Sequence, residues 1–220
     1  ILNNKTLNTF FRRIKKNGGE FSYRKIQKAR KKIYEANITI FNALEKTDKD
    51  PKAQYSFERY ITAHAIMISF EGIPAIYLNS IFGTPNDFNK YIVTNNKRDL
   101  NRYKWNKKKL EKKLKNKHSK QYKFYKEITR LLLIRKNQKA FHPNAIRKTI
   151  KSNKNFFMFK RISLDKKQTV TCIFNLTSKI QNLNLDKKSM NLKNLLNDQK
   201  LYSINNKVQI EPFQTLWLSD

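Results

Sequence analysis

Apolar residues recur every three or four positions in several parts of the chain, and this spacing predicts amphipathic helices. The clearest ones cover residues 6–17, 56–70 and 122–138, and a shorter one lies around 107–114. A glycine pair follows the first helix directly, as glycines often do where a helix ends. The helix over 56–70 stops just before an apolar run with a different pattern.

The run from Ile73 to Leu78 contains no lysine and does not alternate between apolar and polar positions. A strand with this pattern has both faces covered, which is typical of a parallel sheet in an α/β fold. Pro74 is compatible with that assignment, because the first residues of a strand need not donate to the ladder. No second convincing strand occurs in this half of the chain, so the neighbouring strands are expected to lie outside this chain.

From residue 153 onward, apolar and polar positions alternate in short runs separated by polar turns. The runs are FFMFKRIS, QTVTCIFNLT, IQNLNL and KVQIEPFQTLWLSD, with NLKNLLND between the third and the fourth. Several short strands at this spacing predict a small antiparallel sheet. The fold class expected is α/β, with one domain over 1–140 and an antiparallel β-sheet domain over 153–220.

Lysine and arginine outnumber aspartate and glutamate by 48 to 16, which gives a formal net charge of +32. A field of this sign attracts polyanions, so nucleic-acid binding is the alternative function that composition raises. The excess, however, is of lysine (37) together with asparagine (26), which indicates a biased coding composition. Nucleic-acid readout favours clustered basic residues with aromatic platforms. The lysine run 104–120 is the best candidate, and a solvated surface helix is the preferred interpretation of it.

The single cysteine, Cys172, excludes an intramolecular disulfide and agrees with a reducing compartment. No run approaches the ~18 apolar residues of a membrane helix, and the first residues, ILNNKTLNTFF, do not resemble a signal peptide. A cytoplasmic chain without a membrane partner is therefore expected. His64, His118 and His142 share no ligand spacing with one another or with Cys172, so neither a metal site nor a cofactor is predicted.

Several segments, taken in order, resemble a known family. They are YEANITIFNAL, GIPAIYLNSIFG, TNNKRDLNRYKW, LLLIRKNQKAFHPNA, and NLKNLLND with IEPFQTLWL. Together they are similar to the C-terminal part of the α-amylase superfamily (glycoside hydrolase family 13). Within it, the likeness is greatest to sucrose phosphorylases and related glucoside phosphorylases, such as those acting on sucrose 6-phosphate or glucosylglycerate. The resemblance runs from about Leu7 to Asp220.

The resemblance implies a fold: the C-terminal fragment of a (β/α)₈ TIM barrel, made of its last helices and eighth strand, followed by a small antiparallel β-sheet domain. Residues 73–78 would be the eighth strand, and the helices over 56–70 and 122–138 would be the seventh and eighth barrel helices. An apolar strand then makes sense, because the interior of such a barrel is a packed core.

The resemblance also implies a chemistry, which is retaining transfer of a glucosyl unit from a glucoside to inorganic phosphate. Such a transfer needs two carboxyl groups about 5 Å apart. In the family these groups come from the fourth and fifth strands, and a His-Asp pair follows the seventh. All of them would lie upstream of this chain, so we expect no catalytic residue here. The chain alone would be inactive and would require the N-terminal barrel portion.

The resemblance also implies that residues of this chain contact the substrate. Arg98, in NNKRD, matches the family arginine that binds the non-reducing end of the glucosyl unit, and a guanidinium fork can hold two sugar oxygens. Tyr34 and Glu35 match a loop that presents groups to the acceptor sugar and to phosphate. Sucrose phosphorylases carry glutamine at the Glu35 position, so the acceptor stays open. The alternative for all three is that they are ordinary surface residues. Asp87 and Asp99 are interpreted as partners that order their loop, not as catalytic acids.

Overall fold

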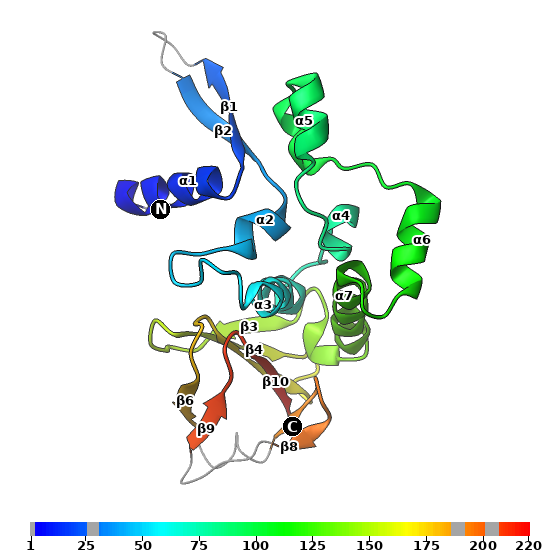
Figure 1. Cartoon of the computed structure of the whole chain (residues 1–220). Helices are drawn as coiled ribbons and strands as arrows, with labels where there is room; N and C mark the ends of the chain where they lie inside the picture. Colours follow the sequence, from blue (N-terminus) through cyan, green and yellow to red (C-terminus); the bar gives the residue numbers. More distant parts are fainter. Residues whose placement is uncertain (1–2, 26–30, 186–191, 201–206) are drawn as a thin grey trace. The chain divides into compact units, whose positions relative to one another are not determined.

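The computed structural model describes residues 3–25, 31–185, 192–200 and 207–220 (Figure 1). The helices are α1 (Asn4–Lys16), α2 (Ile40–Glu45), α3 (Ser56–Ser69), α4 (Leu78–Ile81), α5 (Phe88–Thr94), α6 (Lys107–Lys115) and α7 (Lys120–Lys136), with 3₁₀ turns η1 (Lys97–Asn101) and η2 (Lys139–Phe141). The strands are β1 (Glu20–Lys25), β2 (Lys31–Asn37), β3 (Ile146–Thr149), β4 (Phe156–Ile162), β5 (Thr169–Asn175), β6 (Gln181–Asn184), β7 (Lys193–Asn194), β8 (Gln199–Lys200), β9 (Lys207–Ile210) and β10 (Thr215–Ser219).

The chain forms two compact units that interleave along the sequence. Unit 1 comprises Ile1–Ser56 and Ile76–Tyr125, and unit 2 comprises Phe57–Ala75 and Lys126–Asp220. These units do not coincide with the expected division between residues 140 and 153, which concerns the domains of a complete barrel enzyme and stays a prediction.

Unit 1 contains the β1–β2 hairpin and a series of short helices. Its first helix begins where the side chain of Asn3 accepts a hydrogen bond from the backbone of Thr6, and it ends at Lys16, just before the glycine pair, as predicted. Gly18 has φ +78°, and a Cβ there would lie 2.6 Å from the ring of Phe88. A glycine is therefore required at this turn.

A buried polar network joins three segments of unit 1. The side chain of Asn86 accepts from the backbone of Thr39 at 2.8 Å and donates to the carbonyl of Gly18 at 3.1 Å. The backbone of Asn86 donates to the side chain of Asn42 at 2.6 Å. Because buried polar groups are costly without partners, this network fixes the start of α2 and the loop before α5 relative to the end of α1.

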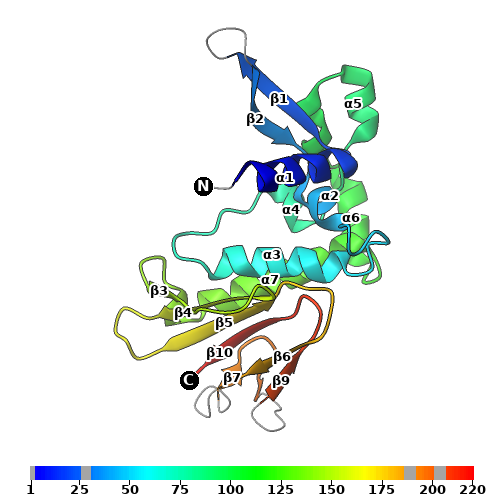
Figure 2. The ribbon, with the colours of Figure 1, turned by 90° about the vertical axis from the view of Figure 1, so that its left-hand side faces the viewer.

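Unit 2 is built on a six-stranded antiparallel sheet in the order β3-β4-β5-β10-β7-β8, accompanied by the β6–β9 pair. Figure 2 shows α3 and α7 on one face of this sheet and the β6–β9 pair on the other. The predicted antiparallel sheet is therefore confirmed. The last predicted strand is in fact two, β9 and β10, separated by a turn in which Phe213 adopts φ +53°.

Alternation along β4 explains why both faces of the sheet are covered. Phe156 and Met158 belong to the apolar core that includes Val208 and Ile210 of β9. Phe159 points to the helical side, where its ring stacks on Phe70 with centroids 5.3 Å apart. Because successive side chains of a strand point to opposite faces, β4 contributes apolar side chains to the layers on both faces of the sheet.

Two buried arginines satisfy the C-terminal end of α3, where helix carbonyls lack partners within the helix. Arg135 donates to the carbonyls of Ile68, Phe70 and Gly72. Arg161 on β4 donates to the carbonyl of Ser69 at 2.8 Å. These bonds tie α3 to α7 and to the sheet.

The prediction of a strand over 73–78 is wrong in this structure. Residues 73–77 belong to no strand, and α4 begins at Leu78. Ile73 is 84% and Leu78 62% exposed. A strand needs a neighbour for its backbone groups, and every strand pair among the described residues is antiparallel and lies elsewhere. The apolar composition of this run was therefore not sufficient to predict either a strand or its burial.

The sequence patterns did not predict two strand regions. The hairpin β1–β2 lies in a passage that reads as polar and lysine-rich, and β3 lies in the passage that leads into the sheet domain. Neither is strongly apolar: all four residues of β3 are exposed. Their pairing with a neighbouring strand, rather than their own hydrophobicity, makes them strands.

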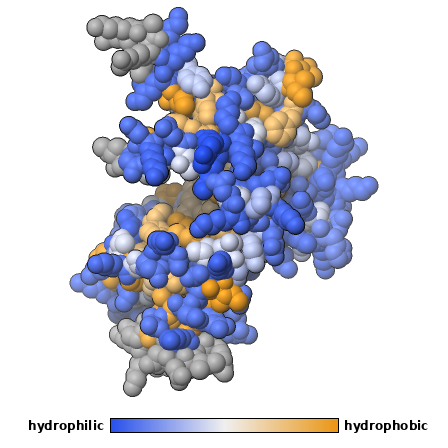
Figure 3. Space-filling model, turned by 60° about the vertical axis from the view of Figure 1, so that its left-hand side comes forward, coloured by the Kyte–Doolittle hydropathy of each residue, from blue (hydrophilic) through white to orange (hydrophobic). Residues whose placement is uncertain are grey.

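The surface of the structure agrees with the interpretation of the lysine run 104–120 as a solvated surface helix. Helix α6 has no buried residue, and only Leu110 and Leu114 on its apolar side are half-buried. Figure 3 shows a visible face that is mostly hydrophilic, with hydrophobic residues in separate patches. Within the described ranges, no helix combines the length and apolar composition needed to cross a membrane.

Cys172 is expected to resist thiol reagents in the folded protein. It is fully buried in β5, and burial raises the pKa of its thiol far above the ordinary value. The native chain should therefore show no fast reaction with a water-soluble aromatic disulfide at pH 8, whereas the chain in denaturant should react with one thiol. Rapid reaction under native conditions would contradict this packing.

Candidate functional site

The structure brings together the three residues that the sequence resemblance singled out. Arg98 lies on η1, and Tyr34 and Glu35 lie on β2, all in unit 1. The Nε of Arg98 donates to Oε2 of Glu35 at 3.0 Å, across 63 positions of sequence. Hydrogen bonding and charge interaction with Glu35, with a further contribution from Tyr34, raise the pKa of the Arg98 guanidinium. The three side chains therefore form one cluster.

Tyr34 occupies an irregular position in the hairpin. In the pairing of β1 with β2, Ser22 lies opposite Glu35 and Tyr23 lies opposite Ile33, so Tyr34 is the extra residue of a β-bulge. A bulge bends its strand and re-aims a side chain. Tyr34 as a whole residue is 52% exposed.

The segment before Arg98 fixes its position relative to the hairpin. Asn96 caps η1, its side chain accepting from the backbone of Arg98 at 3.2 Å. The ammonium of Lys97 donates to the carbonyl of Phe21 at 2.8 Å and lies 5.7 Å from the centre of the Tyr23 ring. Lys97 thus anchors η1 to β1, and Arg98 meets Glu35 on β2. The Arg98 side chain remains 45% exposed.

Two aspartates order this loop, as the sequence predicted. Asp87 caps α5, since its side chain accepts from the backbone of Lys90 at 3.0 Å. Asp99 on η1 pairs with the Lys90 ammonium and accepts from the Thr94 hydroxyl at 2.7 Å. The Asp87 carboxylate therefore orders the start of α5, and the Asp99 carboxylate joins η1 to α5.

Acid should weaken unit 1 through Asp99. The hydrogen bonds from Lys90 and Thr94 hold the pKa of the Asp99 carboxyl below its ordinary value of 3.8. A depressed pKa contributes stability that is present above 3.8 and is lost as pH falls through the folded-state value. An Asp99→Asn variant should therefore be less stable than the wild type at pH 7. Its stability should also fall less than that of the wild type on acidification to pH 3.

This acid effect can be measured as melting midpoints followed through Trp105, the tryptophan of unit 1, at several pH values. The matched control is Asp48→Asn, whose carboxylate pairs with Arg13 and Lys16 at the exposed surface and should contribute little. Equal slopes for the wild type and Asp99→Asn would contradict the assignment.

Other titratable groups have structural partners. Glu71 accepts from Arg147 at 2.6 Å, and this hydrogen bond lowers the pKa of its carboxyl. His64 is buried against Tyr60, and burial lowers the pKa of its imidazole. In the part of the chain that the structure describes, no three His, Cys, Asp or Glu side chains lie where they could hold a metal.

A cavity of about 140 Å³ in unit 1 is lined by uncharged polar groups. They include Thr39, Asn79, Thr84 and Asn101. The side-chain oxygen of Asn101, on the same 3₁₀ turn as Arg98, is buried without a hydrogen-bond partner among the described residues. Neutral donors and acceptors of this kind suit hydroxyl groups of a small ligand.

The sequence did not reveal the ion pair of Arg98 with Glu35, the bulge at Tyr34 or the anchor made by Lys97. One usable signal was present: Phe21 and Tyr23 alternate with polar residues in EFSYRK, as in a strand. The pairing partner lies across residues 26–30, which fall outside the described part of the chain.

The class of fold follows from solved structures, although no family model matches the chain. The chain is similar to sucrose 6F-phosphate phosphorylase from Thermoanaerobacter thermosaccharolyticum, with a TM-score of 0.62 and 18% sequence identity. The match covers 79% of this chain and 32% of that chain. The chain therefore has the fold of one part of such an enzyme.

The curated proteins that the chain matches belong to a narrower class of enzyme. The chain is 28% identical over 185 residues to the glucosylglycerate phosphorylase of Escherichia coli (strain K12), covering 84% of this chain and 32% of that protein. It is 30% identical over 187 residues to the glucosylglycerate phosphorylase of Allomeiothermus silvanus, covering 85% and 31%. The chain spans about a third of the length of the curated relatives it matches. The resemblance to glucoside phosphorylases of the α-amylase superfamily is confirmed.

Proposed function

We propose that this chain is the C-terminal part of a retaining glucoside phosphorylase, and that glucosylglycerate is its glucoside. In the reaction the glycosidic bond breaks, the glucosyl carbon bonds to an oxygen of inorganic phosphate, and the leaving glycerate oxygen takes a proton. The observation that carries the proposal is the cluster of Arg98, Glu35 and Tyr34, which joins three residues of the family pattern in a chain similar to such enzymes.

Each member of the cluster has a proposed role. The Arg98 guanidinium donates to two hydroxyls at the non-reducing end of the glucosyl unit. Glu35 holds that guanidinium in place through its 3.0 Å hydrogen bond. The Tyr34 hydroxyl, presented by the bulge, donates to a phosphate oxygen. Sucrose phosphorylases carry glutamine at the position of Glu35. With glutamate there, the side chain orients Arg98 in addition to contacting the acceptor.

The catalytic carboxylates are proposed to come from an N-terminal barrel portion, with 1–140 completing the barrel and 153–220 forming its β-sheet domain. Ile73 and Pro74 line an open groove of about 490 Å³, together with Leu132 and Phe141. Covering such apolar side chains stabilises a protein by roughly 25 cal/mol per Å². We propose that barrel strands cover them and that 73–78 then becomes the eighth strand. The expected cytoplasmic location stays a prediction.

The proposal is tested by joining the chain to an N-terminal barrel portion, supplied by its own upstream reading frame or by a glucosylglycerate phosphorylase. The joined protein should release glucose 1-phosphate from glucosylglycerate only when phosphate is present, and the chain alone should not. If the joined protein released glucose without phosphate, its reaction would be hydrolysis and not phosphorolysis. Affinity for duplex DNA that falls steeply between two salt concentrations, without any glucoside activity, would favour the nucleic-acid alternative.

A further inference from the structure

Lysines are concentrated in one segment of unit 1. Nine of the 17 residues over 104–120 are lysine, compared with 37 of 220 in the whole chain, and the segment holds a single carboxylate, that of Glu111. Helix α6 occupies the middle of this segment, and none of its residues is buried. A biased composition of the whole chain does not explain so local an excess.

Most of these ammonium groups are free to meet a ligand. Lys107 makes a long contact of 4.0 Å with the Glu111 carboxylate. Lys109, Lys112 and Lys113 are exposed and have no ion pair in the described ranges. Because residues four apart lie on one face of a helix, Lys109 and Lys113 project from the same side of α6. Such a row suits a chain of phosphates, since each phosphate that a lysine neutralises releases counterions and adds affinity.

A cavity of about 380 Å³ adjoins these lysines and lies entirely within unit 1. Lys113 lines it together with three aromatic side chains, which are Phe88, Tyr103 and Trp105. Phe88 is 45% exposed. The indole of Trp105 is held in place, because its Nε1 donates to the Thr84 hydroxyl at 3.0 Å and its ring meets that of Tyr103 edge-on. The volume lies within the range of small-molecule sites, which start at about 300 Å³.

The polar groups of this cavity suit the edge of a nucleobase. The side-chain amides of Asn89 and Gln121 have no hydrogen-bond partner in the part of the chain that the structure describes. An amide presents a donor and an acceptor together, which matches N7 and the N6 amino group of adenine. Asp87, the carboxylate at this lining, already accepts from the backbone of Lys90 at 3.0 Å. An uncharged base inside, with its phosphates outside along α6, avoids repulsion from Asp87.

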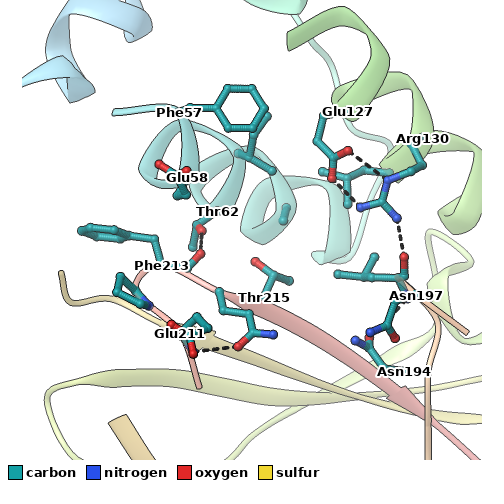
Figure 4. A pocket seen from close by; sticks show the side chains of 16 residues that line it. Phe57, Glu58, Thr62, Glu127, Arg130, Asn194, Asn197, Glu211, Phe213 and Thr215 are labelled. Carbon is teal, nitrogen blue, oxygen red and sulfur yellow. Dashed lines mark hydrogen bonds and ion pairs between the residues drawn. The ribbon is translucent and has the colours of Figure 1, made fainter. Parts of the chain in front are cut away.

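A cavity of similar volume in unit 2 offers a useful contrast. Its arginine, Arg130, is paired with Glu127 and donates to the Leu196 carbonyl (Figure 4). Glu58 and Glu211 at the same lining have no ion pair within the described ranges, so their charge repels a polyanion. Of these two cavities, the one in unit 1 is therefore the one that fits a phosphate chain.

We propose that α6 and the adjoining cavity of unit 1 bind single-stranded nucleic acid. One base enters the cavity, where its ring stacks on Phe88 and its edge bonds the amides of Asn89 and Gln121. The neighbouring phosphates follow the lysines of α6. A single strand fits better than a duplex, because its bases are free to turn toward an aromatic ring. The site shares no residue with the cluster that carries the proposed phosphorylase reaction, so both functions can be present in one protein.

Fluorescence anisotropy of a labelled oligoadenylate tests this inference on the chain itself. The single strand should bind at least about 10-fold more tightly than a duplex of the same length, and its affinity should fall as salt is raised. It should also quench the emission of Trp105, which lines the cavity, whereas inorganic polyphosphate should not. Equal affinity for the duplex would overturn the proposal, and so would Trp105 emission that the oligonucleotide leaves unchanged.

One pair of variants tests the stacking ring. Phe88→Leu keeps an apolar side chain but removes the ring, and it should weaken binding of the single strand at least about fivefold. The control is Phe10→Leu on α1, a phenylalanine that is 48% exposed and lies outside the cavity lining, which should leave the affinity unchanged. Equal affinities of the two variants would exclude a base in the cavity. If Phe88→Leu fails to fold, the quenching of Trp105 still decides the point.

A second pair of variants tests the phosphate contacts. Replacing Lys109 and Lys113 together with glutamine should lower the slope of log affinity against log salt by about 1.4, the value for two phosphates of a single strand. Replacing Lys151 and Lys154 with glutamine removes the same charge from exposed positions of unit 2 and should leave the slope unchanged. Equal slopes for the two double variants would mean that the strand responds only to the overall charge. None of these assays requires enzymatic activity, so their outcome does not depend on the phosphorylase test.

Discussion

Replacing Arg161 with methionine should lower the free energy of unfolding of unit 2 by about 3–5 kcal/mol. Arg161 is fully buried on β4, and its guanidinium donates to the carbonyls of Ser69 and His142 at 2.8 Å each and to that of Ala145 at 3.3 Å. Methionine fills a similar volume but donates nothing, so three carbonyls lose this donor, and among the described residues only that of His142 keeps another one, the backbone N–H of Ala145 at 2.9 Å. Relief of repulsion from the neighbouring Arg135 offsets only part of this loss.

The measurement is urea unfolding followed through Trp217, the buried tryptophan of unit 2, in a Trp105→Phe background. The control is Arg147→Met, which removes an arginine that pairs with Glu71 at the exposed surface and should cost at most about 1 kcal/mol. A loss for Arg161→Met as small as that of the control would show that the α3 terminus is satisfied in another way.

Replacing Arg98 with alanine in the joined, active protein should lower kcat/KM for the glucoside by at least about 100-fold, which corresponds to about 3 kcal/mol of lost transition-state stabilisation. The reason is that a guanidinium fork which bonds two sugar oxygens has no replacement in alanine. Arg98→Lys should be intermediate, because lysine keeps the charge but loses the fork.

The control for this variant is Arg102→Ala, an exposed arginine just after η1. It should leave kcat/KM within about twofold, since no substrate contact is assigned to it. A Glu35→Gln variant adds a separate readout: loss of the ion pair with Arg98 should raise KM more than it lowers kcat. Unchanged kcat/KM for Arg98→Ala would remove Arg98 from the site.

Local periodicity explains which elements could be predicted. The helices over 56–70 and 122–138 and the strands at β4 and β5 each carry their own apolar face, so their pattern alone predicts them. The run over 73–78 has the right composition for a buried strand, but burial depends on neighbours that these residues do not specify. The split of the last strand depends on a positive φ at Phe213, which a non-glycine residue does not signal.

The three residues of the cluster were singled out from the sequence, but the contact between them was not predicted. The resemblance identified Arg98, Tyr34 and Glu35 from short motifs. Their contact requires the pairing of β1 with β2 and the anchoring of η1 by Lys97, both of which join distant segments. Long-range pairing of this kind leaves no local pattern in the sequence.

Amide hydrogen exchange over 73–78 tests the central proposal most directly, that these residues become a barrel strand when the neighbouring strands are supplied. In the chain alone the amides of Ile73, Ala75 and Tyr77 should exchange rapidly, while Gly72, which donates to the Pro143 carbonyl at 2.9 Å, is protected. In the joined protein the amides over 75–78 should become protected by at least about 100-fold. Continued rapid exchange there, in a protein that forms glucose 1-phosphate, would contradict the account.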